Sequence, residues 1–234
     1  MTLSLLHADW RAVVDDVPVD GDGYAFDAVI TDPPFSRDTH VGFNAAKRCP
    51  REDGVQARRL DYDGWTPHMV ASFVHRLAPL TRCWFACLTD DVLAPAYRRA
   101  YRRVGFADFA QVPCVIRGMT CRHAGDGPSS EAVYLMVGRR RGKASHLGTK
   151  PGYYVVPREA GLVRVGGKPL GLMQAIVRDY TLPGWRVVDP CAGGGTTLVA
   201  CASLGRSCLG IERDLETFNA MQARVAEASQ PVML

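Results

Sequence analysis

The sequence predicts an α/β fold in which a mostly parallel sheet is covered by helices on both faces. Short apolar segments alternate with segments of helical periodicity along nearly the whole chain, and this alternation favours parallel strands joined by helices. Several apolar segments have the continuous hydrophobicity of a strand buried on both faces. The 234 residues are enough for one large core, so we expect a single domain over residues 1–234.

Apolar runs and helix-capping residues locate the individual elements. The run FDAVIT at residues 26–31 stops at Asp-Pro-Pro, which indicates a buried strand that ends in a rigid loop. Thr66 can cap a helix that has Pro67 in its first turn. The expected strands are residues 26–31, 82–88, 109–117, 132–138, 185–189 and 207–212. The expected helices are residues 67–77, a segment between Asp90 and Gly105, and residues 169–180, 196–204 and 214–228.

Composition excludes several classes of protein. Apolar residues make up 47% and charged residues 22% of the chain, which is typical of a folded globular protein. Apolar runs are all shorter than the roughly 20 residues that span a bilayer, and the N-terminus lacks the pattern of a secretory signal. We therefore expect a cytoplasmic protein with no membrane partner. The net charge of +4 permits nucleic-acid binding without demonstrating it.

The eight cysteines are expected to be buried, reduced thiols. None of them forms a CxxC pair, and most lie in apolar, strand-like segments. A metal site that uses Cys83, Cys87, Cys114, Cys121 and His123 is an alternative, but the spacing fits no zinc pattern well. We expect no metal.

Two connections are longer than the roughly 15 residues that ordinary loops reach, namely residues 36–64 and 139–167. Both are candidate target-recognition segments. The second is basic and contains two tyrosines, so it could bind phosphates and stack on bases. The candidate nucleic-acid-binding residues are Arg139, Arg140, Arg141, Lys143 and Lys150. A surface loop without that role is an almost equal alternative, and the basic run 98–103 is more simply explained as a solvated helix face.

A glycine-rich turn between residues 189 and 197 indicates a binding site. The sequence VVDPCAGGGTT predicts a strand, a tight turn and a helix start, and Glu212 follows at the tip of the next strand. Glycines let a ligand approach the amides at a helix N-terminus, and a carboxylate after the second strand can accept both hydroxyls of a ribose. The spacing matches neither GxGxxG nor the phosphate loop GxxxxGK[ST]. The turn therefore favours a nucleoside-containing ligand over a purely structural role.

The tetrapeptide Asp32-Pro33-Pro34-Phe35 suggests the chemistry. An amino group on a base is a poor nucleophile because its lone pair is delocalised into the ring. The Asp32 carboxylate and the Pro33 carbonyl can accept its hydrogens, and Phe35 offers a flat face for a flipped base. An ordinary Asp-Pro turn is the alternative explanation for this motif.

Together, these motifs resemble the beta class of DNA amino-methyltransferases. That family has a D/N/S-P-P-Y/F motif early in the chain and a glycine-rich cofactor motif late. Leu6-His7-Ala8-Asp9-Trp10 is similar to the family's opening strand and turn, and Lys168-Pro169-Leu170 is similar to its Lys-Pro-Leu helix. The resemblance implies a Rossmann-like class I methyltransferase fold with a seven-stranded sheet. It also implies S-adenosylmethionine as the cofactor.

The resemblance implies roles for individual residues. Asp32, Pro33, Pro34 and Phe35 would be the catalytic residues, and the base nitrogen would attack the sulfonium methyl directly. Glu212 would bind the ribose, Asp9 and Trp10 would lie near the adenine ring, and Lys168 would lie close to the cofactor carboxylate. The full set of expected cofactor-binding residues is Asp9, Trp10, Asp32, Lys168, Asp189, Cys191, Ala192, Gly193, Gly195, Thr196, Thr197, Glu212 and Arg213.

Aspartate in the first position of the catalytic motif is, in that family, more usual for methylation at N6 of adenine than at N4 of cytosine. We expect DNA as the partner and adenine as the target, with cytosine N4 and RNA as alternatives. A non-catalytic, cofactor-binding subunit and a dehydrogenase are the remaining rivals, and the late position of the glycine turn argues against the second. A homodimer is expected by analogy, and a separate specificity partner stays open.

Overall fold

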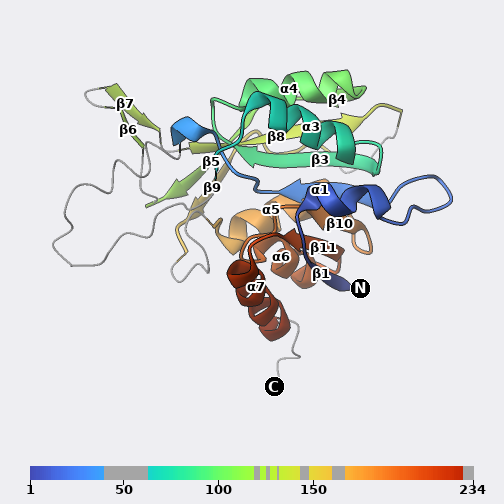
Figure 1. The fold of residues 1–234 in the computed structure, drawn as a ribbon. Helices are drawn as coiled ribbons and strands as arrows, with labels where there is room; N and C mark the ends of the chain where they lie inside the picture. The colour runs from blue at the N-terminus through green and yellow to red at the C-terminus, as the bar shows by residue number, and fades with distance from the viewer. Residues whose placement is uncertain are drawn as a thin grey trace.

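The fold is built on one large mixed sheet. The computed structural model describes residues 1–39, 63–118, 122–124, 127–130, 132–142, 148–159 and 167–228. The strands of the sheet are β1 Leu3–His7, β2 Phe26–Thr31, β3 Thr81–Thr89, β4 Phe106–Asp108, β5 Val112–Arg117, β8 Ala132–Arg140, β9 Tyr154–Pro157, β10 Arg186–Asp189 and β11 Ser207–Glu212. Their order is β1-β11-β10-β2-β3-β8-β5-β9, with β4 paired to β8 (Figure 1). A separate two-stranded ribbon pairs β6 Arg122–Ala124 with β7 Gly127–Ser130.

Five neighbouring strands, β1, β11, β10, β2 and β3, run parallel to one another. β8 then pairs antiparallel with β3, β4 and β5, and β9 pairs parallel with β5. Because the five parallel strands share one direction, their carboxyl ends lie along one edge of the sheet. The chain leaves β2 toward one face of the sheet and leaves β10 toward the other face. A crevice is therefore expected at the carboxyl ends of these two neighbouring strands.

Helices cover both faces of the sheet, as Figure 1 shows. One face carries α1 Trp10–Val13, α3 Pro67–Leu77 and α4 Ala94–Arg103. The other face carries α5 Leu170–Tyr180, α6 Thr196–Ser203 and α7 Leu215–Ala228. Two clusters of buried side chains fill the layers, one on each side of the sheet. Every helix in the described residues is too short or too polar to cross a bilayer.

Local chemistry explains where the helices begin. Thr66 Oγ1 accepts a hydrogen bond from the Met69 amide at 3.3 Å, and Pro67 occupies the first turn of α3. The apolar residues of α3 at helical spacing, Val70, Phe73, Val74 and Leu77, are all buried. The capped helix expected after Thr66 is therefore confirmed.

The sheet has more strands than the seven that the resemblance implied. The strand expected over 109–117 begins only at Val112, as β5, and a separate short strand, β4, precedes it at 106–108; both pair with β8. Residues 109–111 interrupt them. β9 lies inside 139–167, which the sequence left as a long loop, and the basic residues Arg139 and Arg140 belong to β8. These strands form because a neighbouring strand offers unpaired backbone groups, and that information is not local to the segment.

Candidate active site

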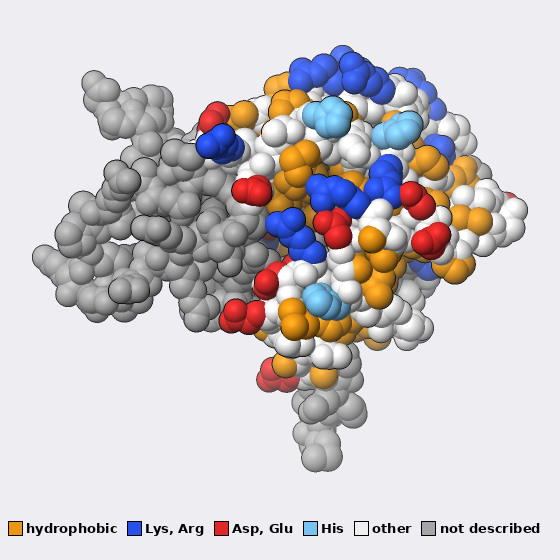
Figure 2. All heavy atoms as spheres, viewed as in Figure 1, with side chains coloured by type: hydrophobic (Ala, Val, Ile, Leu, Met, Phe, Trp, Pro, Cys, Tyr) orange, Lys and Arg blue, Asp and Glu red, His pale blue; other side chains and the backbone are white. Residues whose placement is uncertain are grey.

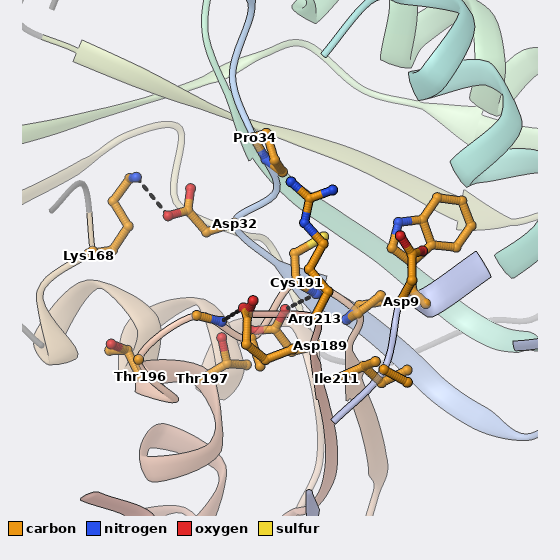
Figure 3. Close-up of a pocket in the computed structure, with 18 of the residues that line it drawn as sticks. Asp9, Asp32, Pro34, Lys168, Asp189, Cys191, Thr196, Thr197, Ile211 and Arg213 are labelled. Atoms are coloured by element: carbon orange, nitrogen blue, oxygen red, sulfur yellow. Dashed lines mark hydrogen bonds and ion pairs between the residues drawn. The ribbon is translucent and has the colours of Figure 1, made fainter. Parts of the chain in front are cut away.

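A cavity opens at the carboxyl ends of the parallel strands (Figure 3). It receives residues that follow β1, β2, β10 and β11, and Lys168 reaches it from just before α5. The catalytic motif and the glycine-rich turn therefore lie together, because β2 and β10 are adjacent strands. Thr31 Oγ1 donates to Asp189 Oδ1 at 2.6 Å and joins the two strand ends directly.

The glycine-rich turn adopts the conformation that its sequence predicts. Gly195 has φ +76° and is the N-cap of α6, and Gly193 has φ +51°. A Cβ on Gly195 would lie 2.8 Å from Met221 Cγ, whereas a Cβ on Gly193 would meet no atom within 4 Å. Gly195 is thus required by backbone shape and by packing against α7, while the turn at Gly193 leaves open space beside its backbone.

The Glu212 carboxylate organises the floor of the cavity. Its Oε2 accepts from the Gly193 amide and its Oε1 accepts from the Asp214 amide, both at 2.9 Å. The side chain is buried and fixed at the tip of β11. Each carboxylate oxygen can accept a second hydrogen bond, so Glu212 can bind a pair of neighbouring hydroxyl groups.

Asp189 is a buried carboxyl at the end of β10. It accepts from Thr31 Oγ1 and from the Cys191 amide, the latter at 3.1 Å. Burial raises the pKa of Asp189 to about 6, although hydrogen bonds from Thr197 and Thr31 oppose the effect. Only 1% of the surface of Asp189 is exposed, so it holds the turn from the protein interior.

Asp32 follows β2 and forms an ion pair with Lys168. Lys168 Nζ lies 2.7 Å from Asp32 Oδ2 and 4.6 Å from the centre of the Phe35 ring. Burial raises the pKa of Asp32, and the charge and hydrogen bond of Lys168 lower it in opposition. Asp32 Oδ1 is buried and has no hydrogen-bond partner among the described residues. A buried acceptor without a hydrogen bond costs free energy of folding unless a ligand donates a hydrogen bond to it.

Trp10 forms an apolar wall on the far side of the cavity. It is 5% exposed, packs edge-on against Phe73 with 4.9 Å between ring centres, and carries the Arg11 guanidinium over its ring at 5.0 Å. Asp9 caps α1 by accepting from the Arg11 amide and also pairs with the Arg11 side chain at 2.9 Å. Together with Ile211, Trp10 offers a surface suited to a flat, apolar group.

Arg213 is the residue after Glu212, and its side chain is exposed. In Figure 3 its side chain extends from the end of β11 across the cavity in the direction of Pro34. A cation is thereby placed between the glycine-rich turn and the loop that follows β2.

The cavity brings together most of the residues expected from the sequence. Those that line it are Asp9, Trp10, Asp32, Pro34, Lys168, Asp189, Cys191, Ala192, Gly193, Thr196, Thr197, Glu212 and Arg213. Pro33, Phe35 and Gly195 do not line it, although Phe35 touches Lys168 and Gly195 shapes the turn. Lys168 was expected beside a cofactor carboxylate, and here it is bound to Asp32.

The candidate nucleic-acid residues lie elsewhere. Arg140 donates to the carbonyls of Ala78 and Thr81 at the amino end of β3 and stacks on Phe106. Arg139 lies over the rings of Trp84 and Phe109. Both therefore serve the fold at the edge of the sheet opposite the cavity. Arg141 is exposed, Lys150 is also outside the cavity, and Lys143 is outside the described residues. A role for this group in binding nucleic acid stays a prediction.

Helix α4 carries the second basic run, and Figure 2 shows blue side chains gathered over it at the top of the view. Its exposed arginines are Arg98, Arg99, Arg102 and Arg103. Arg98 and Arg102 bind Asp108 at 3.1 and 2.9 Å. These contacts fit the simpler explanation, a solvated helix face.

The described cysteines are free thiols, and all except Cys191 are buried. Burial raises the pKa of Cys87 and Cys114, the latter to about 12, so these thiols stay protonated. Burial of the cysteines is confirmed at Cys83, Cys87, Cys114, Cys201 and Cys208. Cys49 and Cys121 lie outside the described residues.

Some residues of the site were not found from the sequence. The cavity residues absent from the expected set are Ala8, Arg11, Trp65, Gly167, Met173, Pro190, Gly194 and Ile211. Ile211 had a usable signal, because it immediately precedes the carboxylate at the tip of a predicted strand. Trp65 had none, because it follows a long connection and reaches the cavity only through the tertiary fold.

Known proteins resemble this chain in sequence. Residues 163–223 match the N6/N4 DNA methylase family. The "Type II methyltransferase M2.MboI" of Moraxella bovis is 38% identical over 66 residues, which cover 28% of this chain and 24% of that protein. The "Putative methylase YubD" of Escherichia coli K12 is 26% identical over 219 residues, which cover 87% of this chain and 83% of that protein. The chain thus matches about a quarter of the length of the first relative and most of the second.

Solved structures share the fold. The M1.HpyAVI–SAM complex superposes with a TM-score of 0.72 at 20% identity and covers 96% of this chain and 99% of its own. TTHA0409 of Thermus thermophilus, a putative DNA modification methylase solved with S-adenosyl-L-methionine, gives 0.71 at 20% identity, with coverage of 99% and 96%. The cytosine-N4-specific PvuII DNA methyltransferase gives 0.67 at 12% identity, with coverage of 98% and 92%. The Rossmann-like methyltransferase fold is confirmed. Residues 163–223 therefore resemble the N6/N4 DNA methylase family that the motifs predict, and the chain shares its fold with DNA methyltransferases over nearly its whole length.

Proposed function

We propose that this protein transfers a methyl group from S-adenosylmethionine to the exocyclic amino group of a DNA base, with N6 of adenine as the target. One observation carries the proposal. A buried carboxylate oxygen, Asp32 Oδ1, lacks a partner among the described residues and lies in the same cavity as a glycine-rich nucleoside-type turn. An acceptor and a cofactor cradle in one cavity are what this transfer requires.

The residues of the cavity fit S-adenosylmethionine. Glu212 is fixed by two backbone amides and retains capacity for the two ribose hydroxyls. Trp10 and Ile211 suit the adenine ring, and the open backbone at Gly193 leaves room beside the turn. The N-terminal turn of α6, with Thr196 and Thr197, favours a negatively charged carboxylate.

When bound, the cofactor supplies a methyl group that its sulfonium charge activates toward attack. The protein prepares the nucleophile. Asp32 Oδ1 accepts one hydrogen of the base amine, which draws the nitrogen lone pair out of conjugation with the ring. The proposed acceptor of the other hydrogen is the carbonyl of the next residue, Pro33, which is not among the residues that line the cavity. Lys168 holds Oδ2 of the same carboxylate and keeps its second oxygen oriented. The amine must lose one proton after transfer, and the ionised Asp32 is placed to receive it.

The choice of base rests on the residue type at position 32. In the family that the motifs resemble, aspartate is more usual in adenine-N6 enzymes than in cytosine-N4 enzymes. DNA is the proposed polymer because the matching family is a DNA methylase family and two of the similar solved structures are named as DNA methylases. A base in a duplex has to leave its stack to reach Asp32, at a cost of a few kcal/mol.

Product analysis tests the proposal. The purified protein is incubated with labelled S-adenosylmethionine and with duplex DNA, single-stranded DNA or RNA, and the digested nucleosides are identified by mass spectrometry. We expect N6-methyl-2′-deoxyadenosine from DNA. N4-methylcytosine would reassign the base, a labelled ribonucleoside would reassign the polymer, and cofactor binding without any transfer would indicate a non-catalytic subunit.

Replacement of the proposed acceptor links the product to the site. Asp32→Ala is expected to reduce kcat by roughly 10²- to 10⁴-fold while the Kd for S-adenosylmethionine changes little. Asp22→Ala is the matched control, because Asp22 is an exposed carboxylate outside the cavity. Transfer at the wild-type rate by Asp32→Ala would remove Asp32 from the mechanism.

A further inference from the structure

Asp90 follows β3 directly and is one of the few buried carboxylates that lie outside the cavity, with 5% of its surface exposed. Its Oδ2 accepts from the Ser36 amide at 2.8 Å, from Ser36 Oγ at 2.5 Å and from Thr39 Oγ1 at 2.6 Å. Its Oδ1 accepts from the Leu93 amide at 2.9 Å. One oxygen thus holds the segment after the catalytic motif, and the other holds the turn that precedes α4.

A second contact holds the same segment from its other side. The Trp65 amide donates to the Phe35 carbonyl at 2.8 Å, and Ser36 forms an isolated parallel bridge with Trp65. Gly64 makes this close approach feasible, because a Cβ there would lie 2.5 Å from the Arg37 nitrogen. The backbone at Phe35 and Ser36 is therefore fixed by Asp90 on one side and by Trp65 on the other.

The path from Ser36 back to Asp32 is short and stiff. The pyrrolidine rings of Pro33 and Pro34 restrict φ at both positions. Because these torsions cannot adjust freely, a displacement of Ser36 also displaces Asp32. β2 fixes the other end of this segment at Thr31, which bonds to Asp189. The position of Asp32 Oδ1 thus depends on two anchors, and Asp90 supplies the one that follows the motif.

We propose that Asp90 is a positioning residue for methyl transfer, which holds the Asp32–Phe35 segment in its reactive geometry through Ser36 and Thr39. The inference rests on the proposed function of Asp32. Asp90 touches neither the cofactor site nor the base site, and its effect is confined to the placement of the acceptor oxygens. Errors of about 1 Å in such placement cost on the order of a hundredfold in rate.

The experiment compares Asp90→Ala and Asp90→Asn with the wild-type protein. For Asp90→Ala we expect kcat to fall by about 30- to 100-fold, with an unchanged Kd for S-adenosylmethionine. Asp90→Asn retains one acceptor oxygen and is expected to lose clearly less. Hydrogen exchange at the Ser36 amide should speed up in Asp90→Ala, because its acceptor is gone, while exchange within β2 stays slow.

Two controls separate positioning from a general loss of stability. Asp91→Asn changes the neighbouring exposed carboxylate and should keep the wild-type kcat. Val70→Ala removes a fully buried side chain of α3, and should lower Tm without lowering kcat at a temperature where the variant is folded. An equal loss of kcat in Val70→Ala at the same Tm would assign the Asp90 effect to stability and overturn the proposal.

The outcomes for the two proposals can be told apart. An active wild-type protein whose Asp90→Ala variant keeps the wild-type kcat would overturn the positioning role alone. A wild-type protein that methylates no nucleic acid would overturn the proposed function, and the positioning role with it. A loss of cofactor affinity equal to the loss of kcat would place Asp90 in cofactor binding and also overturn the inference.

Discussion

The two edges of the parallel sheet use the same residue type in opposite ways. At the amino edge, Asp20, Asp22 and Asp27 face two arginines. Arg82 bonds to all three carboxylates, and Arg186 bonds to Asp20 at 2.5 Å and to Asp27. At the carboxyl edge, Asp32, Asp189 and Glu212 gather around the cavity, and Asp32 forms an ion pair with Lys168.

Electrostatics follow the same division. The Tyr24 amide, with the Arg186 and Arg82 side chains, lowers the pKa of Asp20 well below its usual range. At the other edge, burial raises the pKa of Asp32 and brings that of Asp189 to about 6. Carboxylates at the amino edge have their charge compensated by the protein, whereas at the carboxyl edge an acceptor remains for a ligand. The first arrangement compensates charge within the fold, and the second is the one on which the proposed function depends.

The largest difference between the two edges is expected in how their carboxylates make folding stability depend on pH. Asp189 has a folded-state pKa of about 6, against 3.8 as its ordinary value, so it contributes stability while protonated and loses it as pH rises from about 4 to 6. Asp189→Asn should lack this loss. The difference in free energy of unfolding between this variant and the wild type should therefore change with pH by up to about 3 kcal/mol. Urea unfolding from pH 4 to pH 7 measures it.

Asp20 gives the opposite sign in the same experiment. Its pKa is lowered, so its contribution is present above about pH 4 and is lost as pH falls. Equal pH slopes for Asp189→Asn and wild type would contradict the assigned pKa shift at the carboxyl edge.

The second-largest effect is expected on the affinity for the cofactor. Glu212→Ala removes the acceptor for two hydroxyl groups and releases the Gly193 amide, so the Kd for S-adenosylmethionine should rise about a hundredfold. Titration calorimetry measures the change. Asp22→Ala at the amino edge is the control and should bind like the wild type, whereas an unchanged Kd for Glu212→Ala would remove it from the site.

Removal of Lys168 should act on the rate and on its pH dependence. Lys168 lowers the pKa of Asp32, so Lys168→Met raises that pKa, and the acid limb of the kcat profile should move to higher pH. At neutral pH we expect kcat to fall about tenfold, because a larger fraction of Asp32 is protonated. Lys168→Arg, which keeps the charge, should move the limb less. A profile that does not move would show that Asp32 does not control the rate.

The smallest effect is expected at the amino edge. Arg82→Ala breaks contacts to three carboxylates that are partly exposed and should lower Tm by roughly 2–4 °C. The Kd for S-adenosylmethionine should stay constant, since the network lies at the opposite edge from the cavity. Calorimetry of the melting transition measures the first quantity, and a weakened Kd would mean that the two edges are coupled.

Much of the site was predictable because its chemistry is local in sequence. The Asp-Pro-Pro-Phe motif, the glycine turn and Glu212 each sit at the end of an apolar run, and parallel strands necessarily bring such ends to one edge. Lys168 could be placed near them from its motif, but its partner could not, because the bond to Asp32 joins residues 136 positions apart. The surroundings of the basic run 139–141 could not be predicted for the same reason, since charge alone does not reveal that Arg139 and Arg140 lie over aromatic rings of the fold.

By itself, the sequence determined the α/β alternation, most helix starts and strand ends, and most of the residues that line the cavity, because periodicity and turn chemistry act between near neighbours. Only the tertiary structure decided that β9 completes the sheet, that Trp65 closes the cavity, and that Asp90 holds the segment after Asp32. Those features depend on which unpaired backbone groups and buried carboxylates meet after the chain has folded, and spacing along the chain does not encode such meetings.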